Sequence, residues 1–244
     1  MMLRPDIALP ALGASSAQFA VMGCASAQGH VVQQLTAYHL LGEYDREMRL
    51  LNGKRAVFLR PTIFRARQLV AFAGVHQSAE AVAVADTLLR QSTDSIAYNV
   101  IAVVRGGEGF GVHGDSVTSQ RLFKMAVTWF AAHPESRSRL PTALSSGIAF
   151  LATGSPDIAV SQFATLARDS ANLGGAGFLG LSAIAKGDRV RAVAIADSLG
   201  ALKRRWLFGE HTFWRDAILG ALGRSDEAAQ LFRQAHREGQ SMRS

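Results

Sequence analysis

The residues of this chain that most resemble a chemical motif are the glycines of Gly109-Phe110-Gly111-Val112-His113-Gly114, which match the pattern G-x-G-x-x-G. In dinucleotide-binding proteins this pattern joins a strand to a helix, and its glycines let the backbone approach a pyrophosphate. The run 97–104 before it is apolar enough for a buried strand. No second strand-like run follows near residue 135, and a βαβ unit needs one. We favour an inter-helix connection and keep a nucleotide-binding enzyme domain that uses the Gly106–Gly114 loop as the alternative.

The seven histidines and the single cysteine form no recognisable catalytic or metal-binding motif. His30 and His39 are nine residues apart and His113 and His133 are twenty apart, whereas helical zinc motifs such as H-E-x-x-H place their histidines one turn apart. Cys24 has no neighbouring basic residue to activate it, and no G-x-S-x-G nucleophile elbow occurs. We therefore expect no catalytic residue, no metal site and no cofactor, and hence not an enzyme.

The elements that position these residues are predicted to be helices. The chain has 244 residues, of which 48% are hydrophobic and only six are proline. Gly209–Gly239 shows the basic unit most clearly, because two runs of apolar residues at helical spacing are separated by Gly223-Arg224-Ser225. The same layout recurs upstream, and we expect helix pairs over 30–58, 63–90, 95–132, 139–169, 178–202 and 209–239.

Glycine or histidine marks the turn of each predicted pair. The turn residues lie at intervals of 34, 38, 40, 33 and 36 residues and are Gly42, His76, Gly114, Gly154, Gly187 and Gly223. We expect a positive φ at each, since histidine is among the residues that tolerate it. Five residues later stand mostly small residues that let helices approach closely: Glu47, Ala81, Ser119, Ala159, Ala192 and Ala228. Nine residues later stand mostly larger ones that fill the gap to the next pair: Leu51, Ala85, Phe123, Phe163, Ala196 and Phe232.

This turn and second helix resemble the tetratricopeptide repeat, whose unit is about 34 residues. The best matches are Leu222–Ala228 with Phe232 and Ala235, and Leu41–Asp45. The resemblance covers about residues 30–239, although the first helices lack the family's Trp and Leu-Gly positions and the middle units are longer. It implies an all-α, right-handed solenoid of tandem antiparallel helical hairpins, about six in number. It also implies a non-catalytic scaffold that binds protein or peptide, of the kind attached to bacterial signalling and regulatory proteins as a sensor or docking region.

The resemblance also implies a binding groove, since the first helices of such pairs line the concave face. Nine residues before the turns stand Gln33, Arg67, Arg105, Ser145, Phe178 and Trp214. This row changes from polar and basic to aromatic, which suits an extended peptide with an acidic end and an apolar end. Gln33, Arg67, Arg105, Phe178 and Trp214 are therefore the candidate binding residues. The family's carboxylate clamp needs an asparagine that this row lacks, so the clamp is not carried over.

The ends of the chain lie outside the repeats. Residues 1–29 are an uncertain segment, either an edge helix or a weak signal-like sequence, because Ala25-Ser26-Ala27 resembles a cleavage site and Val21–Cys24 a lipoprotein acylation box. We expect a cytoplasmic protein; if Met1–Ala27 is a signal, the protein is exported or lipid-anchored. No run reaches the roughly 18 apolar residues of a membrane span. Residues 240–244 form a tail, and we expect the natural protein to continue beyond Ser244 and cover the outer face of the last helix.

The formal net charge of +7 raises a second alternative, a basic nucleic-acid-binding helical repeat. The only run of three consecutive basic residues is Lys203-Arg204-Arg205, beside the aromatic residues Trp206, Phe208, Phe213 and Trp214. Nucleic-acid-binding proteins usually gather their charge on one stripe, and aromatic residues at helical spacing usually pack between helices. We therefore do not expect nucleic acid as the partner, and the oligomeric state is left open.

Overall fold

The computed structural model describes residues 24–58, 60–92, 98–138, 142–168, 172–204 and 207–239. These residues form twelve α-helices, packed as sequential antiparallel pairs. The chain divides between Trp129 and Phe130 into two compact units, which we call the N-terminal unit and the C-terminal unit. The predicted all-α fold of tandem helix pairs is confirmed.

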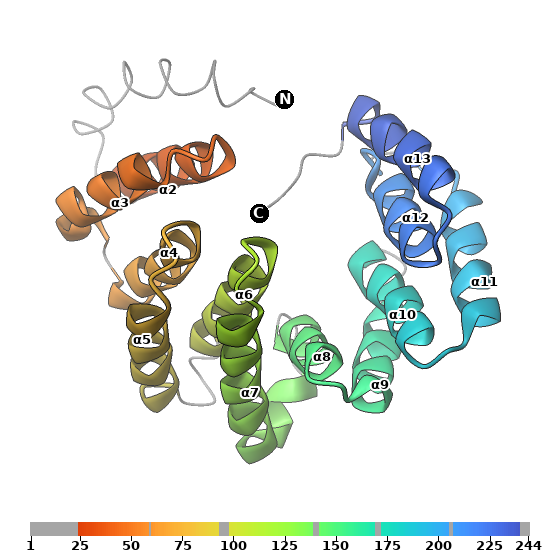
Figure 1. Ribbon diagram of the computed structural model, residues 1–244, viewed down its shortest axis with the longest axis horizontal. Helices are drawn as coiled ribbons and strands as arrows, with labels where there is room; N and C mark the ends of the chain where they lie inside the picture. The colour runs from red at the N-terminus through yellow and green to blue at the C-terminus, as the bar shows by residue number, and fades with distance from the viewer. Residues whose placement is uncertain are drawn as a thin grey trace. The chain divides into compact units, whose positions relative to one another are not determined.

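The N-terminal unit contains three helix pairs (Figure 1). Within it α4 packs against both its partner α5 and the first helix of the next pair, α6. A short 3-10 helix, η1 (Arg55–Val57), follows the first pair. The helices are α2 (Cys24–Leu40), α3 (Tyr44–Gly53), α4 (Pro61–Gly74), α5 (Ser78–Arg90), α6 (Tyr98–Val112) and α7 (Ser116–Ala132), the last of which ends beyond the unit boundary.

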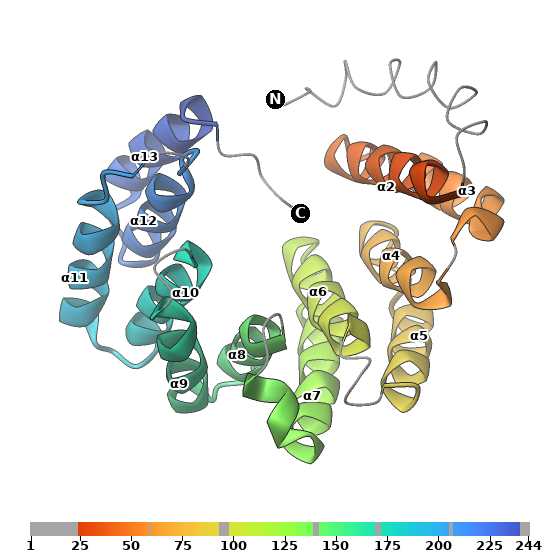
Figure 2. The same ribbon diagram turned by 180° about the vertical axis from the view of Figure 1, so that it is seen from behind.

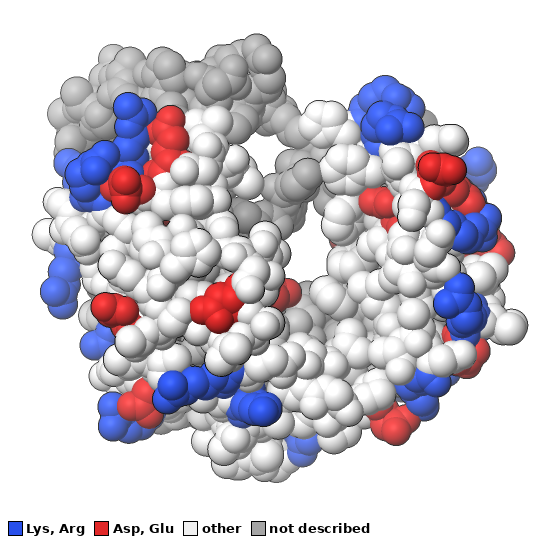
Figure 3. Space-filling model, in the orientation of Figure 1, with Lys and Arg blue, Asp and Glu red and all other residues white. Residues whose placement is uncertain are grey.

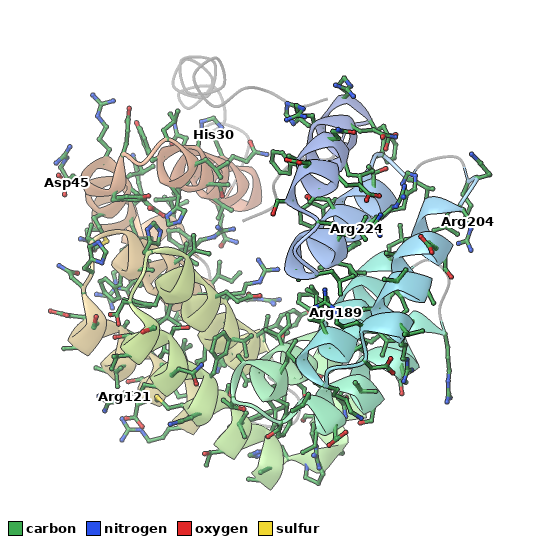
Figure 4. The ribbon with its side chains drawn as sticks, turned by 45° about the vertical axis from the view of Figure 1, so that its right-hand side comes forward. His30, Asp45, Arg121, Arg189, Arg204 and Arg224 are labelled. Carbon is green, nitrogen blue, oxygen red and sulfur yellow. The ribbon has the colours of Figure 1, made fainter. Side chains whose placement is uncertain are left out.

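The C-terminal unit begins with the 3-10 helix η2 (Pro134–Ser138) and also contains three pairs (Figure 2). Its first helices α10 and α12 lie against each other. Arg189, labelled in Figure 4, donates a 2.7 Å hydrogen bond to the Leu222 carbonyl at the end of α12 and so ties two pairs together. The helices are α8 (Thr142–Ala152), α9 (Pro156–Ala167), α10 (Leu173–Ala185), α11 (Arg189–Gly200), α12 (Glu210–Ala221) and α13 (Ser225–Arg237).

All six predicted turn residues have positive φ. The φ values are 72° at Gly42, 55° at His76, 84° at Gly114, 80° at Gly154, 80° at Gly187 and 83° at Gly223. In each turn the N–H of the following residue donates to the carbonyl five residues before it, at 2.8 to 3.0 Å. This is the 6→1 bond of a Schellman motif, which satisfies a carbonyl at the helix end. The turn register that was predicted from glycine and histidine spacing is therefore confirmed.

The predicted packing positions on the second helices are largely confirmed as well. The residues five positions after each turn are all buried: Glu47, Ala81, Ser119, Ala159, Ala192 and Ala228. Nine positions after the turn, five of the six are buried and only Phe232, on α13, is exposed, at 39%. Its neighbour Leu231 is buried in the core of the C-terminal unit.

The predicted Gly106–Gly114 loop is wrong, because α6 continues to Val112 and contains most of it. Its residues 98–104 are helical rather than a strand. A Cβ added at Gly107 would lie 3.0 Å from the Phe123 ring, and one added at Gly106 would lie 3.3 Å from Leu69 Cβ. Close packing of α6 against α7 and α4 therefore compensates the weak helix propensity of glycine. The Gly106–Gly114 segment therefore does not form the strand-to-helix loop on which the nucleotide-binding alternative depended.

The predicted start of α10 at Phe178 is also wrong, since the helix begins at Leu173. Asn172 caps it, because its side-chain oxygen accepts the Gly175 N–H at 2.9 Å. Asparagine is a preferred N-cap residue, so this signal was present in the sequence. The glycines that follow it obscured the helix.

Replacing Gly223 by valine is expected to lower the free energy of unfolding of the last helix pair by about 1–2 kcal/mol. A Cβ at Gly223 would meet nothing within 4 Å, so this loss comes from the left-handed backbone alone. Chemical denaturation measures it, with Gly220→Ala in α12 as the control. That added Cβ makes an ordinary 3.5 Å contact with Ala228, and it is expected to be neutral or to stabilise by up to about 1 kcal/mol. An unchanged midpoint in the valine variant would contradict the role of this turn.

Candidate functional site

Two arginines on adjacent first helices form the most polar site among the predicted binding residues. Arg67 lies on α4 and Arg105 on α6, and the two helices pack together. Arg67 is half-buried and donates to Thr36 Oγ1 at 3.4 Å. Burial lowers the pKa of Arg67, the positive charge of Arg105 lowers it further, and the Glu47 carboxylate opposes both. The guanidinium groups therefore lie close enough to repel each other.

No carboxylate among the described residues forms an ion pair with either arginine. The acidic residue closest to Arg105 along α6 is Glu108, one helical turn later. Desolvation by the surrounding protein raises the pKa of the Glu108 carboxyl, while the positive charge of Arg105 opposes that shift. Because the two guanidinium groups lack carboxylate partners, they can donate hydrogen bonds to an anionic group of a ligand.

Gln33 lies exposed on α2, and the structure does not bring it into hydrogen-bond contact with the arginines. The α2 residue that reaches Arg67 is Thr36, one turn further along the helix. Neither Thr36 nor Glu47 was predicted from the sequence to belong to the site. Glu47 carried a signal, since it is a charged residue at a position otherwise occupied by alanine or serine.

Phe178 and Trp214 meet in the C-terminal unit as part of an aromatic row. Phe178 stacks on Phe163 with a centroid distance of 5.1 Å and an interplanar angle of 16°. Its ring also lies 4.8 Å from that of Trp214, which contacts Phe213 at 5.3 Å. Phe178 and Trp214 are both half-buried, so each packs against neighbours and still presents part of its ring to solvent.

The remaining member of the predicted row, Ser145, is buried with 7% of its surface exposed. It is therefore not available to a ligand. The basic and the aromatic residues of the row are thus at least partly exposed, whereas the serine between them is buried.

A hollow of about 630 Å³ lies along α7. Its lining includes Arg121 and Lys124 together with the apolar Val117 and Met125.

On the face shown in Figure 3, blue and red side chains are interspersed rather than gathered in one basic stripe. Arg205 and Trp206, which belonged to the predicted basic and aromatic cluster, lie outside the described residues, and Phe208 is 58% exposed.

The described residues contain no group of three or more His, Cys, Asp or Glu side chains arranged to hold a metal ion. None of their helices has the length and apolar character needed to cross a membrane. Of the signal-like segment, residues 1–23 fall outside the part of the chain that the structure describes, whereas Cys24 and the cleavage-like Ala25-Ser26-Ala27 lie in the first turn of α2.

The sequence matches no protein-family model and no curated protein. The fold is similar to the crystal structure of a tetratricopeptide repeat protein from Parabacteroides merdae, with a TM-score of 0.54 and 13% sequence identity. The match covers 96% of this chain and 94% of that chain. The class of fold is therefore tetratricopeptide-like, in agreement with the resemblance noted in the turns and second helices.

Proposed function

We propose that this protein is a non-catalytic scaffold that binds an extended segment of another protein through the first helices of its pairs. The observation that carries the proposal is the pair Arg67 and Arg105, two mutually repelling guanidinium groups on packed helices without carboxylate partners. Tetratricopeptide-like folds commonly serve as protein-binding scaffolds, which supports the same reading.

The chemistry of the arginine pair favours an acidic group as its ligand. A guanidinium group presents several N–H donors in a plane and binds a carboxylate through two parallel hydrogen bonds. A carboxylate that reaches both arginines would also relieve their repulsion. We therefore infer that the N-terminal unit recognises an Asp or Glu side chain, or a chain-terminal carboxylate, of the bound segment.

The aromatic row favours an apolar group as the ligand of the C-terminal unit. Half-buried Phe178 and Trp214 are held by neighbouring rings, so they lose little side-chain entropy on binding. Rigid aromatic residues of this kind often dominate the energy of protein interfaces. In a bacterial regulatory protein, such a scaffold would act as a docking region.

Replacing both arginines by glutamine is expected to weaken binding of acidic peptides by about tenfold or more, because each charged hydrogen bond contributes roughly 1.5–3 kcal/mol. An array of peptides that vary in acidic and apolar content supplies the probes, and titration calorimetry of the best binders measures their affinity. Arg121→Gln is the matched control, since it removes a positive charge from the second helix α7 rather than from the first helices that carry the pair.

Three outcomes would contradict the proposal. One is an array without preference for acidic peptides, another is unchanged affinity in the double variant, and the third is an equal loss in the Arg121 control. The helical circular dichroism signal of each variant shows whether it remains folded. A reduced affinity in a folded double variant would support the site.

A further inference from the structure

Three histidines from three successive helix pairs form a cluster in the N-terminal unit, and two of them, His39 and His113, contact Tyr44. His39 lies near the end of α2, His76 is the turn residue between α4 and α5, and His113 follows α6. The His113 ring lies 5.4 Å from that of His39 and 6.4 Å from that of His76, measured between centroids. The Tyr44 ring lies 5.1 Å from His113 and 5.4 Å from His39.

Tyr44 and the histidines join the first helix pair to the second and third. Tyr44 is the first residue of α3, and a Cβ added at Gly74 of α4 would lie only 2.4 Å from its ring. The glycine on α4 thus makes room for a ring from α3, and that ring in turn contacts the imidazole that follows α6. The cluster consequently lies at the junction of all three pairs.

Two carboxylates face this cluster, and each has a partner. Glu47 of α3 is 2% exposed, and its Oε2 lies 2.8 Å from His39 Nδ1. Asp115, two residues after His113, accepts hydrogen bonds from Ser78 Oγ at 2.6 Å and from the Thr118 N–H at 2.9 Å. These bonds, helped by the charge of His76, lower the pKa of the Asp115 carboxyl to about 2. His113 forms no ion pair with a carboxylate among the described residues.

We propose that this histidine cluster is an acid-sensitive junction, which holds the first helix pair against the second and third at neutral pH and loosens when its imidazoles become charged. In the neutral form the His113 ring packs edge-on against His39, His76 and Tyr44. When all three are charged, Glu47 balances His39 and Asp115 acts on His76, while His113 stands beside two like charges without a carboxylate of its own. Repulsion then acts between three different helix pairs.

The direction of the pH dependence follows from His113. Burial lowers the pKa of its imidazole below the ordinary value of 6.5, the charges of His39 and His76 lower it further, and Glu47 opposes them. The unfolded chain therefore binds a proton at a higher pH than the folded chain does. The stability contributed by a neutral His113 is present above pH 6.5 and is lost as the pH falls through 6.5 towards the lower folded value.

The experiment compares unfolding and local opening of the full chain at pH 7.5 and pH 5. The wild type, His113→Gln and the control His236→Gln are used, since His236 is exposed on α13 in the C-terminal unit. Hydrogen exchange, corrected for the intrinsic effect of pH, reports the opening of residues 24–53. Between the two pH values, the opening constant of the wild type is expected to rise by roughly three- to tenfold more than that of His113→Gln.

The control variant is expected to keep the pH dependence of the wild type. Because the comparison is between two pH values within each variant, a uniform loss of stability in His113→Gln does not affect it. Equal pH dependence in the wild type and His113→Gln would overturn the proposal, and so would opening confined to the C-terminal unit. An NMR titration that gives His113 a pKa at or above the ordinary imidazole value of 6.5 would also overturn the proposal. None of these measurements depends on the peptide-binding proposal.

Discussion

Replacing Gly209 by alanine is expected to lower the free energy of unfolding of the last helix pair by roughly 3–4 kcal/mol. Gly209 precedes α12 with a φ of 80°, and a Cβ there would lie 2.4 Å from the carbonyl oxygen of Ala235 on α13. A backbone oxygen cannot rotate away as the end of a side chain can. The added methyl group would therefore push α13 off α12, where Leu231 and Ala235 are buried.

Gly223→Ala is the matched control for this prediction. It has nearly the same φ, 83°, but its Cβ would meet nothing within 4 Å. Both variants carry the cost of the left-handed backbone, and only Gly209→Ala carries the clash. Denaturant unfolding is expected to show a loss of unfolding free energy that is roughly twice as large for Gly209→Ala as for Gly223→Ala, because the clash adds to the backbone cost. Equal losses would show that the contact with Ala235 does not constrain α13.

The second large effect is expected for Gly177→Ala in α10. Helix propensity alone predicts stabilisation by about 1 kcal/mol, because alanine is a better helix former than glycine. The structure predicts the opposite, since the new Cβ would lie 2.1 Å from Cδ2 and Cε3 of the Trp214 indole. The indole would have to leave its contact with Phe178, and we expect a loss of roughly 2–3 kcal/mol.

Two comparisons isolate this effect. Gly174→Ala, one turn earlier in α10, adds a Cβ with contacts of 3.5 Å or longer and is expected to be neutral or stabilising. In a Trp214→Ala background, Gly177→Ala is expected to cost nothing, because the clashing ring is gone. A double-mutant cycle by denaturant unfolding measures this coupling. Full additivity of the two substitutions would show that the indole does not constrain Gly177.

The same substitution tests the aromatic row as a binding surface. If Phe178 and Trp214 contact an apolar group of the bound segment, displacement of the indole should weaken peptide binding while the arginine pair of the N-terminal unit stays intact. A folded Gly177→Ala protein that binds the same peptides with wild-type affinity would remove the aromatic row from the proposed function and leave the arginine pair in place.

The sequence by itself determined the turns and the helix pairs they join. A Schellman turn depends on a few consecutive residues, one of which must adopt positive φ, so its position can be predicted locally. This is why glycine spacing located five of the six turns and why His76 could be predicted as the sixth. The small residues on the second helices followed from the same register, because they lie at fixed positions from each turn.

Only the tertiary structure decided how far α6 and α10 extend. Their glycines weaken local helix propensity, and the helices persist because neighbouring rings and side chains occupy the space that a Cβ would fill, as Phe123 does at Gly107 and Trp214 at Gly177. Such contacts join residues far apart in the chain and leave no periodic pattern that a sequence can show.

The candidate site divides in the same way. The sequence placed Arg67 and Arg105 at one register position, and Phe178 and Trp214 at the same position further along. It did not show that the arginines repel each other, that Glu47 pairs with His39, or that histidines from three different pairs cluster beside Tyr44. Register along a helix is a local property, whereas the electrostatic environment of a side chain depends on which other helices pack beside it.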